Sequence, residues 1–316
     1  MTRRAFGAIA VVWVGCAPAV SVDSPPAAPT PQPQEAVQAS SAASGRCALG
    51  SPEACVAAGD RAWTDMRYDD AVSRWDEACA DGVARGCFNA ARVLLVGDQV
   101  DADVSRAAAL FSQGCGAGDA ASCQNGGLLL LEGERLERDV ERALGLLRAG
   151  CDGGAATACK VAGLVLIDGR LRDVDAVAAA DLFDAGCSLG EISACVELGV
   201  RLYRGEGRER DRQRAANLFA QACRRSEGLA CRNLASMHLA GDGVHQDVQL
   251  AATLMEQGCD LSDTPACIAW GQMLVEGAGV EVDRARGLEV LALACERGSA
   301  RACAARREAE AAPAGG

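Results

Sequence analysis

Apolar residues recur along the chain with the spacing of an amphipathic helix, and small residues recur with them. Counting from Cys87, a small residue follows at four positions and large apolar residues at seven and eight, as in Ala91, Leu94 and Leu95. Positions 0, 4, 7 and 8 lie on one helical face, so the pattern predicts a helix of about ten residues. The same pattern starts again at Cys123, Cys159, Cys195, Cys231 and Cys267.

Glycine ends each predicted helix, and aspartate begins the next one. Ten positions after the leading cysteine stands Gly97, Gly133, Gly169, Gly205, Gly241 or Gly277. Glycine just past a helical pattern is a common helix stop because it accepts positive φ without strain. Six positions later stands Asp103, Asp139, Asp175, Asp211, Asp247 or Asp283. We interpret these carboxylates as helix caps and not as catalytic groups, because every unit has one at the same helix start.

The cysteines give this pattern a fixed period. After Cys16 they form eight pairs with C-x(7)-C spacing, and from Cys79 to Cys295 the first member recurs every 36 residues. A period of this length is typical of a solenoid. The sequence therefore predicts an all-α fold, an α/α superhelical solenoid of helix-turn-helix repeats with one disulfide per repeat.

The composition divides the chain into five segments. We expect a signal peptide over 1–15, a Pro/Ala/Ser-rich tether without a fold of its own over 16–45, and an N-terminal cap with a short repeat over 46–86. Six full repeats then occupy 87–302, and 303–316 forms a C-terminal cap and tail. Capping units close the apolar ends of such an array.

The N-terminus has the layout of an export signal. In MTRRAFGAIAVVWVGC two arginines precede an uncharged apolar run, and Cys16 stands where a bacterial lipoprotein signal places its acylated cysteine. Cleavage after Ala19 would instead release a secreted protein, and the paired arginines weakly resemble a twin-arginine signal. We expect an exported bacterial protein, a periplasmic or outer-membrane lipoprotein or otherwise a secreted one, that meets the membrane only through a lipid on Cys16.

The charge of the chain argues against nucleic acid as a partner. The net charge is −12, with 43 acidic residues against 31 basic ones. Binding to a phosphate backbone needs a positive surface, which this composition does not supply.

The paired cysteines predict disulfides. On one continuous helix the two cysteines would lie about 12 Å apart, whereas a disulfide needs Cα atoms within about 7 Å. The Gly, Ser and Asp residues between them indicate that the chain reverses, so each bond would staple one helix to the next. Zinc sites favour C-x(2–4)-C spacing, which is absent here, and we expect no metal and no cofactor. The predicted pairs are Cys47–Cys55, Cys79–Cys87, Cys115–Cys123, Cys151–Cys159, Cys187–Cys195, Cys223–Cys231, Cys259–Cys267 and Cys295–Cys303.

These motifs resemble a known repeat. LGVRLYRGEGRERDRQRAANLFAQAC and LASMHLAGDGVHQDVQLAATLMEQGC are similar to the Sel-one-like (Sel1-like) repeat, a relative of the tetratricopeptide repeat, over roughly residues 50 to 303. With a cysteine pair in every unit, the chain looks like the Hcp family of secreted cysteine-rich repeat proteins. The resemblance implies an α/α superhelix and two functions, scaffolding of protein partners and penicillin binding or β-lactamase activity. The early units lack the second loop glycine of the pattern, which affects the expected shape of their loops.

The residues themselves favour a scaffold over an enzyme. The sequence has no S-x-x-K motif, and Lys160 stands in CKVAG without a serine partner. Only two histidines occur, too few for a histidine-rich zinc hydrolase site. Our first hypothesis is an exported scaffold that binds a protein or peptide on its concave face, and the alternative is a β-lactam hydrolase whose catalytic residues are unknown.

The predicted binding surface follows the first helix of each repeat. In tetratricopeptide-like arrays this helix lines the concave face, here through positions one, five and nine after the leading cysteine, which form one stripe. Leu128, Leu164 and Val200 would form an apolar strip, which either binds a partner or is buried by neighbouring helices. The candidate partner-binding residues are Arg92, Leu128, Lys160, Leu164, Val200, Arg204 and Arg232.

Overall fold

The computed structural model describes residues 50–171 and 173–311, and within them the chain forms fifteen helices and no strand. The predicted signal peptide, the tether, Cys16 and Cys47 lie outside the described residues. The helices are α1 (Pro52–Thr64), α2 (Tyr68–Ala80), α3 (Ala84–Val96), α4 (Val104–Gly116), α5 (Ala120–Glu132), α6 (Val140–Asp152), α7 (Ala156–Ile167), α8 (Ala176–Ser188), α9 (Ile192–Arg204), α10 (Arg212–Arg224), α11 (Gly228–Ala240), α12 (Val248–Asp260), α13 (Thr264–Glu276), α14 (Arg284–Glu296) and α15 (Ala300–Ala311).

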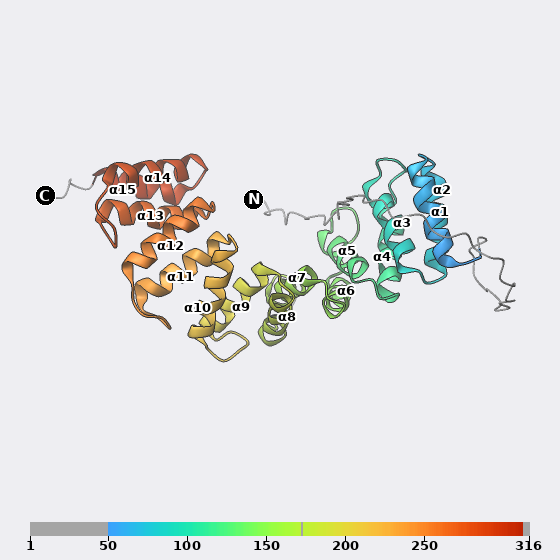
Figure 1. Cartoon of the computed structure of the whole chain (residues 1–316), viewed down its shortest axis with the longest axis horizontal. Helices are drawn as coiled ribbons and strands as arrows, with labels where there is room; N and C mark the ends of the chain where they lie inside the picture. Colours follow the sequence, from blue (N-terminus) through green and yellow to red (C-terminus); the bar gives the residue numbers. More distant parts are fainter. Residues whose placement is uncertain (1–49, 172, 312–316) are drawn as a thin grey trace, which may run out of the picture.

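The predicted all-α solenoid is confirmed. The helices alternate between two rows, which we name A helices (odd-numbered, α1 to α15) and B helices (even-numbered, α2 to α14). Each helix packs mainly against the helices before and after it in the chain. In Figure 1 they follow one another along an arc, with α1–α4 and α13–α15 at its two ends. Near the middle of the arc, α5 and α7 lie on its inner side and α6 and α8 on its outer side (Figure 1).

The A helices are longer than the sequence predicted. From α3 to α13 each begins three residues before the leading cysteine, and most have 13 residues. The added first turn lies between the two cysteines of a pair, where small and polar residues had indicated only a turn.

The predicted aspartate caps are all present. In each of the six B helices from α4 to α14, the aspartate carboxylate accepts a hydrogen bond from the backbone N–H three residues on. The oxygen–nitrogen distances lie between 2.8 and 3.0 Å. This bond satisfies one of the free donors at the helix start and explains why the residue recurs.

The predicted glycine stop holds for five of the six A helices, and the exception is α7. Gly205, with φ of 76°, is typical of the five left-handed helix ends. Helix α7 ends one residue earlier, at Ile167, with Asp168 in an extended conformation, and Gly169 does not have positive φ. Asp168 accepts hydrogen bonds from the side chain and backbone of Arg170, which hold the pKa of its carboxyl at about 2. In this repeat the side chain of Asp168 organises the turn that glycine makes elsewhere.

Small residues let the A and B helices of a repeat pack closely, as the sequence indicated. A Cβ atom at Gly163 would lie 2.6 Å from the ring of Phe183, and one at Gly199 would lie 2.7 Å from the ring of Phe219. Both rings are almost completely buried. A single apolar core runs from α6 to α13 through these contacts.

Seven disulfides join the described helices. Each one ties the last turn of a B helix to the first turn of the next A helix, with Cα atoms 4.4 to 4.7 Å apart. They are the predicted C-x(7)-C pairs from Cys79–Cys87 to Cys295–Cys303. The chain reverses between the two cysteines of each pair, which is the geometry that the spacing required. The remaining predicted pair, Cys47–Cys55, includes a residue outside the described range.

Candidate functional site

The predicted inner-face stripe lies on the A helices and is partly open to solvent. Leu164 on α7 is 37% exposed, and Val96 on α3 is 53% exposed. Leu128 on α5 and Val200 on α9 are half-buried, and Val200 packs against the core of the array. The apolar strip is therefore neither fully buried nor fully exposed, and Leu164 is its most accessible member.

Two predicted partner-binding cations pair with the neighbouring repeat. Lys160 Nζ lies 3.3 Å from Glu191 Oε1 and 3.2 Å from Ser193 Oγ at the start of the next A helix. Thr157 Oγ1 donates to Glu191 Oε2 at 2.9 Å, and Ser193 Oγ donates to Oε1 at 2.5 Å. Burial raises the pKa of Glu191, but the hydrogen bonds from Ser193 and Thr157 and the charge of Lys160 outweigh it, so its pKa is lowered.

Arg232 makes the equivalent contact two repeats later. Its Nε lies 2.8 Å from Oδ1 of Asp263, and the same carboxylate oxygen caps α13 through the N–H of Ala266. Lys160 and Arg232 occupy the same repeat position, and Glu191 and Asp263 are both the residue before an A helix. These pairs therefore fix one A helix against the next, and the two cations are less available to a partner than the sequence suggested.

Two cavities open between A helices, where α1 meets α3 and where α9 meets α11. The first has about 320 Å³ and is lined by Trp63, Arg92 and Val96 among others. The second has about 150 Å³ and includes Val200 and Arg204. These two pairs of A helices approach each other less closely than the other successive A helices do. The predicted residues Arg92, Val200 and Arg204 therefore lie in the recesses of the A-helix face.

The cavity between α9 and α11 has a charged mouth. Tyr203 donates from its hydroxyl to Asp242 Oδ2 at 2.9 Å, and Arg212 lies 5.8 Å over its ring and pairs with Asp242. The hydrogen bond to Asp242 and burial raise the pKa of Tyr203. Arg204 stands beside this group with a side chain 60% exposed, in a long ion pair with Glu206.

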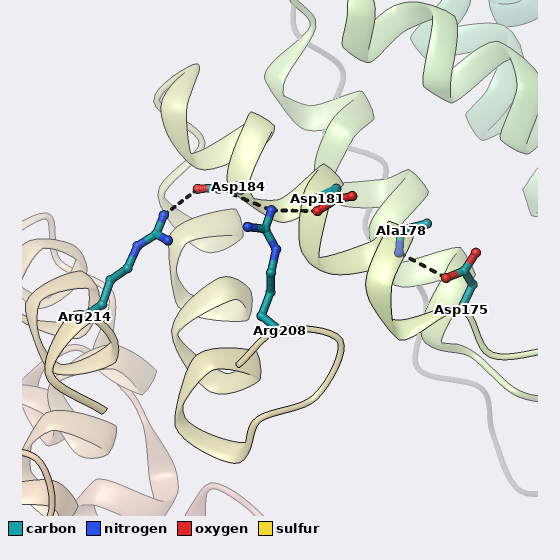
Figure 2. A network of polar contacts seen from close by, with 6 residues as sticks. All are labelled: Asp175, Ala178, Asp181, Asp184, Arg208 and Arg214. Carbon is teal, nitrogen blue, oxygen red and sulfur yellow. Dashed lines mark hydrogen bonds and ion pairs between the residues drawn. The ribbon is translucent and has the colours of Figure 1, made fainter. Parts of the chain in front are cut away.

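The B helices carry a ladder of arginines that the sequence analysis missed. Arg214, the third residue of α10, lies 2.9 Å from Asp184 on α8, and Arg208 from the loop before α10 reaches Asp181 and Asp184 (Figure 2). Arg286 binds Glu256 at 2.6 Å in the same way. The remaining two pairs are Arg106 with Asp76 and Arg142 with Ser112. All four contacts join positions 30 residues apart.

Among the B helices from α4 to α14, the two that lack this arginine also lack its acceptor. Ala178 takes the arginine position in α8, and the matching acceptor position on α6 is Arg148. Leu250 takes it in α12, and the matching position on α10 is Ala220. Aligning the repeats with an offset of 30 residues would have revealed this pairing from the sequence.

The described residues offer no evident metal centre or membrane span. Within 50–171 and 173–311, no three His, Cys, Asp or Glu side chains converge in a group that could hold a metal ion. In the same part of the chain, none of the helices combines the length and apolar character that crossing a membrane requires. The many disulfides indicate an oxidising, extracytoplasmic location.

Comparison with known families identifies the repeat. The family model described as the Sel1 repeat matches five segments that together cover more than half of the chain, at 84–119, 121–154, 192–226, 228–263 and 264–299. The chain belongs to the Sel1 repeat family. Each matched repeat covers one A helix and the B helix that follows, so the disulfides lie at the junctions between Sel1 repeats. The predicted resemblance is confirmed. The search of curated proteins found no significant match to this chain.

Solved structures share the fold. A protective antigen of uropathogenic Escherichia coli superposes with a TM-score of 0.66 at 19% identity, over 73% of this chain and 50% of that one. The chain thus spans about half the length of the Escherichia coli protein. A Sel1 repeat protein of Oxalobacter formigenes gives a TM-score of 0.61 at 17% identity, over 76% of this chain and 96% of that one. Helicobacter pylori cysteine-rich protein B is 25% identical over 40% of this chain and 90% of that one, with a TM-score of 0.34.

Proposed function

We propose that this chain is an exported scaffold whose A-helix face binds a protein or peptide partner. The observation that carries the proposal is the inner face itself, where Leu164 is 37% exposed and two recesses open between A helices. Solenoids use extended concave surfaces of this kind for binding. The residues on this face also change from repeat to repeat, while the helix caps and staples stay the same.

The proposal is tested by placing a charge on the strip. Leu164→Glu should abolish capture of the partner from envelope extracts, because a carboxylate there would be desolvated by a bound apolar surface. Val177→Glu is the matched control, since Val177 is 60% exposed on the B helix α8. The proposal predicts that both variants melt like the wild type and that only Leu164→Glu loses the partner. A large loss of stability in Leu164→Glu would mean instead that the strip belongs to the core.

The second candidate function is β-lactam hydrolysis, and one contact favours it. Lys160 has no serine partner in its own segment CKVAG, but Ser193 Oγ lies 3.2 Å from its amine in the folded chain. Ser193 also donates to Glu191 Oε1 at 2.5 Å, and a serine hydrogen-bonded to a neighbouring base is an arrangement used for nucleophilic catalysis. Ser193 lines neither of the two inner-face cavities, which is why this function stands second.

Hydrolysis of a chromogenic cephalosporin separates this candidate from a scaffold. If Ser193 is a nucleophile, Ser193→Ala should lose all turnover while Ser236→Ala, a change at an exposed serine on α11, keeps it. Equal rates in the wild type, in Ser193→Ala and in a mock preparation would reject the enzyme.

We further propose that Cys16 carries a lipid that holds the scaffold at a membrane. The support is the layout of the N-terminal sequence, in which an apolar run ends at this cysteine. Labelled fatty acid should enter the wild type and not Cys16→Ser. Labelling of neither protein would favour plain secretion.

A further inference from the structure

One repeat differs from the others in its charge. The matched repeat at 192–226, which forms α9 and α10, contains eight arginines against four carboxylates. The other four matched repeats each contain more carboxylates than basic residues, in a chain with net charge −12. A positive repeat in an acidic array creates a local field that attracts negative groups.

The arginines of this repeat serve two different faces. Arg208 and Arg214 point to α8, where Asp181 and Asp184 neutralise them (Figure 2). Arg204 and Arg210 lie at the other end, where the Nη2 of Arg210 donates to the carbonyl of Arg204 at 3.2 Å. Of these two arginines, Arg204 lines the cavity between α9 and α11.

The carboxylates near this mouth are already paired. Glu206 is bound by Arg201 at 3.2 Å, and Asp242 is bound by Arg212 at 2.9 Å and by the hydroxyl of Tyr203. Arg204 reaches Glu206 only at 3.6 Å, and exposed pairs of this kind contribute little. Arg201 also binds Glu197 at 3.3 Å, but Arg210 pairs with no carboxylate of the described residues. The arginines beside the mouth therefore keep a positive charge that a ligand carboxylate can use.

The interior of the cavity is apolar with one free amide. Its walls include Val200, Phe219 and Met237, and the latter two are almost fully buried. The side-chain amide of Asn233 lines the same space and forms no hydrogen bond with any residue that the structure describes. An amide can donate to and accept from the backbone of an extended peptide.

We propose that the cavity between α9 and α11 binds an acidic segment of a partner protein, with an apolar side chain as its anchor. The apolar side chain fills the cavity of about 150 Å³, and a neighbouring carboxylate binds the guanidinium of Arg204. Asn233 holds the peptide backbone between them. This inference rests on the proposed scaffold function and adds the chemistry of the segment that the A-helix face selects.

The inference is tested by fluorescence anisotropy with a short labelled peptide in which leucines stand between aspartates. The controls are the same peptide with asparagine for aspartate and with lysine for aspartate. The wild type should bind the aspartate peptide at least about tenfold more tightly than either control, since a charge-assisted hydrogen bond is lost in both.

Two charge reversals place the site on the molecule. Arg204→Glu should lower the affinity for the aspartate peptide at least about tenfold. Arg225→Glu, at an exposed position after α10, should change this affinity less than about twofold. Equal weakening by both variants would indicate attraction by net charge alone and would overturn the inference. So would equal binding of the three peptides, or tighter binding of a phosphorylated peptide without leucine.

The outcome also separates this inference from the proposed function. A partner captured by the wild type and lost in Leu164→Glu, but retained fully by Arg204→Glu, would support the scaffold and reject the acidic segment. Binding of the aspartate peptide that is lost in Arg204→Glu, combined with unchanged binding in Leu164→Glu, would support this cavity and reject the strip on α7.

Discussion

At the scale of single residues, Glu191 shows how the polar groups of one repeat fix the next. Its side chain is 19% exposed, and it accepts hydrogen bonds from Thr157 and Lys160 of the preceding repeat and from Ser193 beside it. Burial alone would disfavour the carboxylate, but these donors reverse the effect and lower its pKa. The ionised form of Glu191 is therefore the form that the junction between α7 and α9 requires.

This pKa shift makes the contribution of Glu191 depend on pH. Because its pKa is lower in the folded state than in the unfolded one, its contribution is complete above the unfolded-state pKa. The contribution is then lost as the pH falls through the folded-state pKa. Glu191→Gln should therefore cost about 1 kcal/mol in the free energy of unfolding at pH 7 and much less at pH 3. Urea unfolding at both pH values measures this difference.

The exposed loop residue Glu209 supplies the control. Glu209→Gln should leave the free energy of unfolding nearly unchanged at both pH values, since its carboxylate is open to solvent. A cost for Glu191→Gln that stayed the same at pH 7 and pH 3 would show that the charge of Glu191 does not matter.

At the scale of helices, the arginine ladder specifies which B helices lie side by side. The residue pairs match across repeats, so that Arg214 meets Asp184 while Ala178 takes the place opposite Arg148. Placing arginine at 178 should bring two positive charges together and destabilise the array. Adding Arg148→Asp should restore the stability that Ala178→Arg removes, because it creates a new ion pair between α6 and α8.

A double-mutant cycle measures this ion pair. Ala178→Arg and Arg148→Asp should couple favourably by about 0.5 kcal/mol, which is typical of a partly exposed ion pair. The coupling should fall in high salt because exposed charges are screened. The pair Ala178→Gln and Arg148→Asp provides a neutral comparison, and coupling of the same size there would contradict the electrostatic reading.

The helices themselves could be predicted from the sequence, whereas the contacts between helices could be predicted only in part. The aspartate caps and most glycine stops are local signals, so they fixed the B-helix starts and five of six A-helix ends. Gly169 failed as a signal because Asp168 and Arg170 organise that turn through side chains. The arginine ladder and the contact of Lys160 with Ser193 were missed because their partners lie 30 and 33 residues apart, in different repeats.

The proposed binding surface could also be predicted only in part from the sequence. The stripe of positions lies on the A helices, since helical periodicity gives the direction of each side chain. The recess between α9 and α11 could not be predicted, because it depends on how closely two A helices approach. The ion pair between Arg232 and Asp263 could not be predicted either, because it depends on where the next repeat places Asp263.

At the scale of the whole molecule, we expect the disulfides to determine how cooperatively the array unfolds. Each repeat contacts mainly its neighbours, so the stability of the array is close to a sum of repeat and junction terms. A disulfide that closes a loop of this size contributes roughly 2.5 kcal/mol by limiting the unfolded chain. All seven described disulfides close loops of the same length, so the effect of removing one differs between junctions only through the helices that the junction joins.

Removing a central disulfide should make the two halves of the array unfold separately, while removing the terminal one should destabilise only the last helix. Cys187→Ser with Cys195→Ser weakens the junction of α8 and α9, so α1–α8 and α9–α15 should unfold in separate steps in denaturant. Cys295→Ser with Cys303→Ser frees only α15, whose buried face consists of Ala302, Ala305 and Ala309 and contributes little. Hydrogen exchange followed by mass spectrometry should thus show two blocks of protection in the first variant, and fast exchange confined to α15 in the second. A single cooperative transition in both variants would mean that helix packing across the junctions, and not the staples, holds the repeats together.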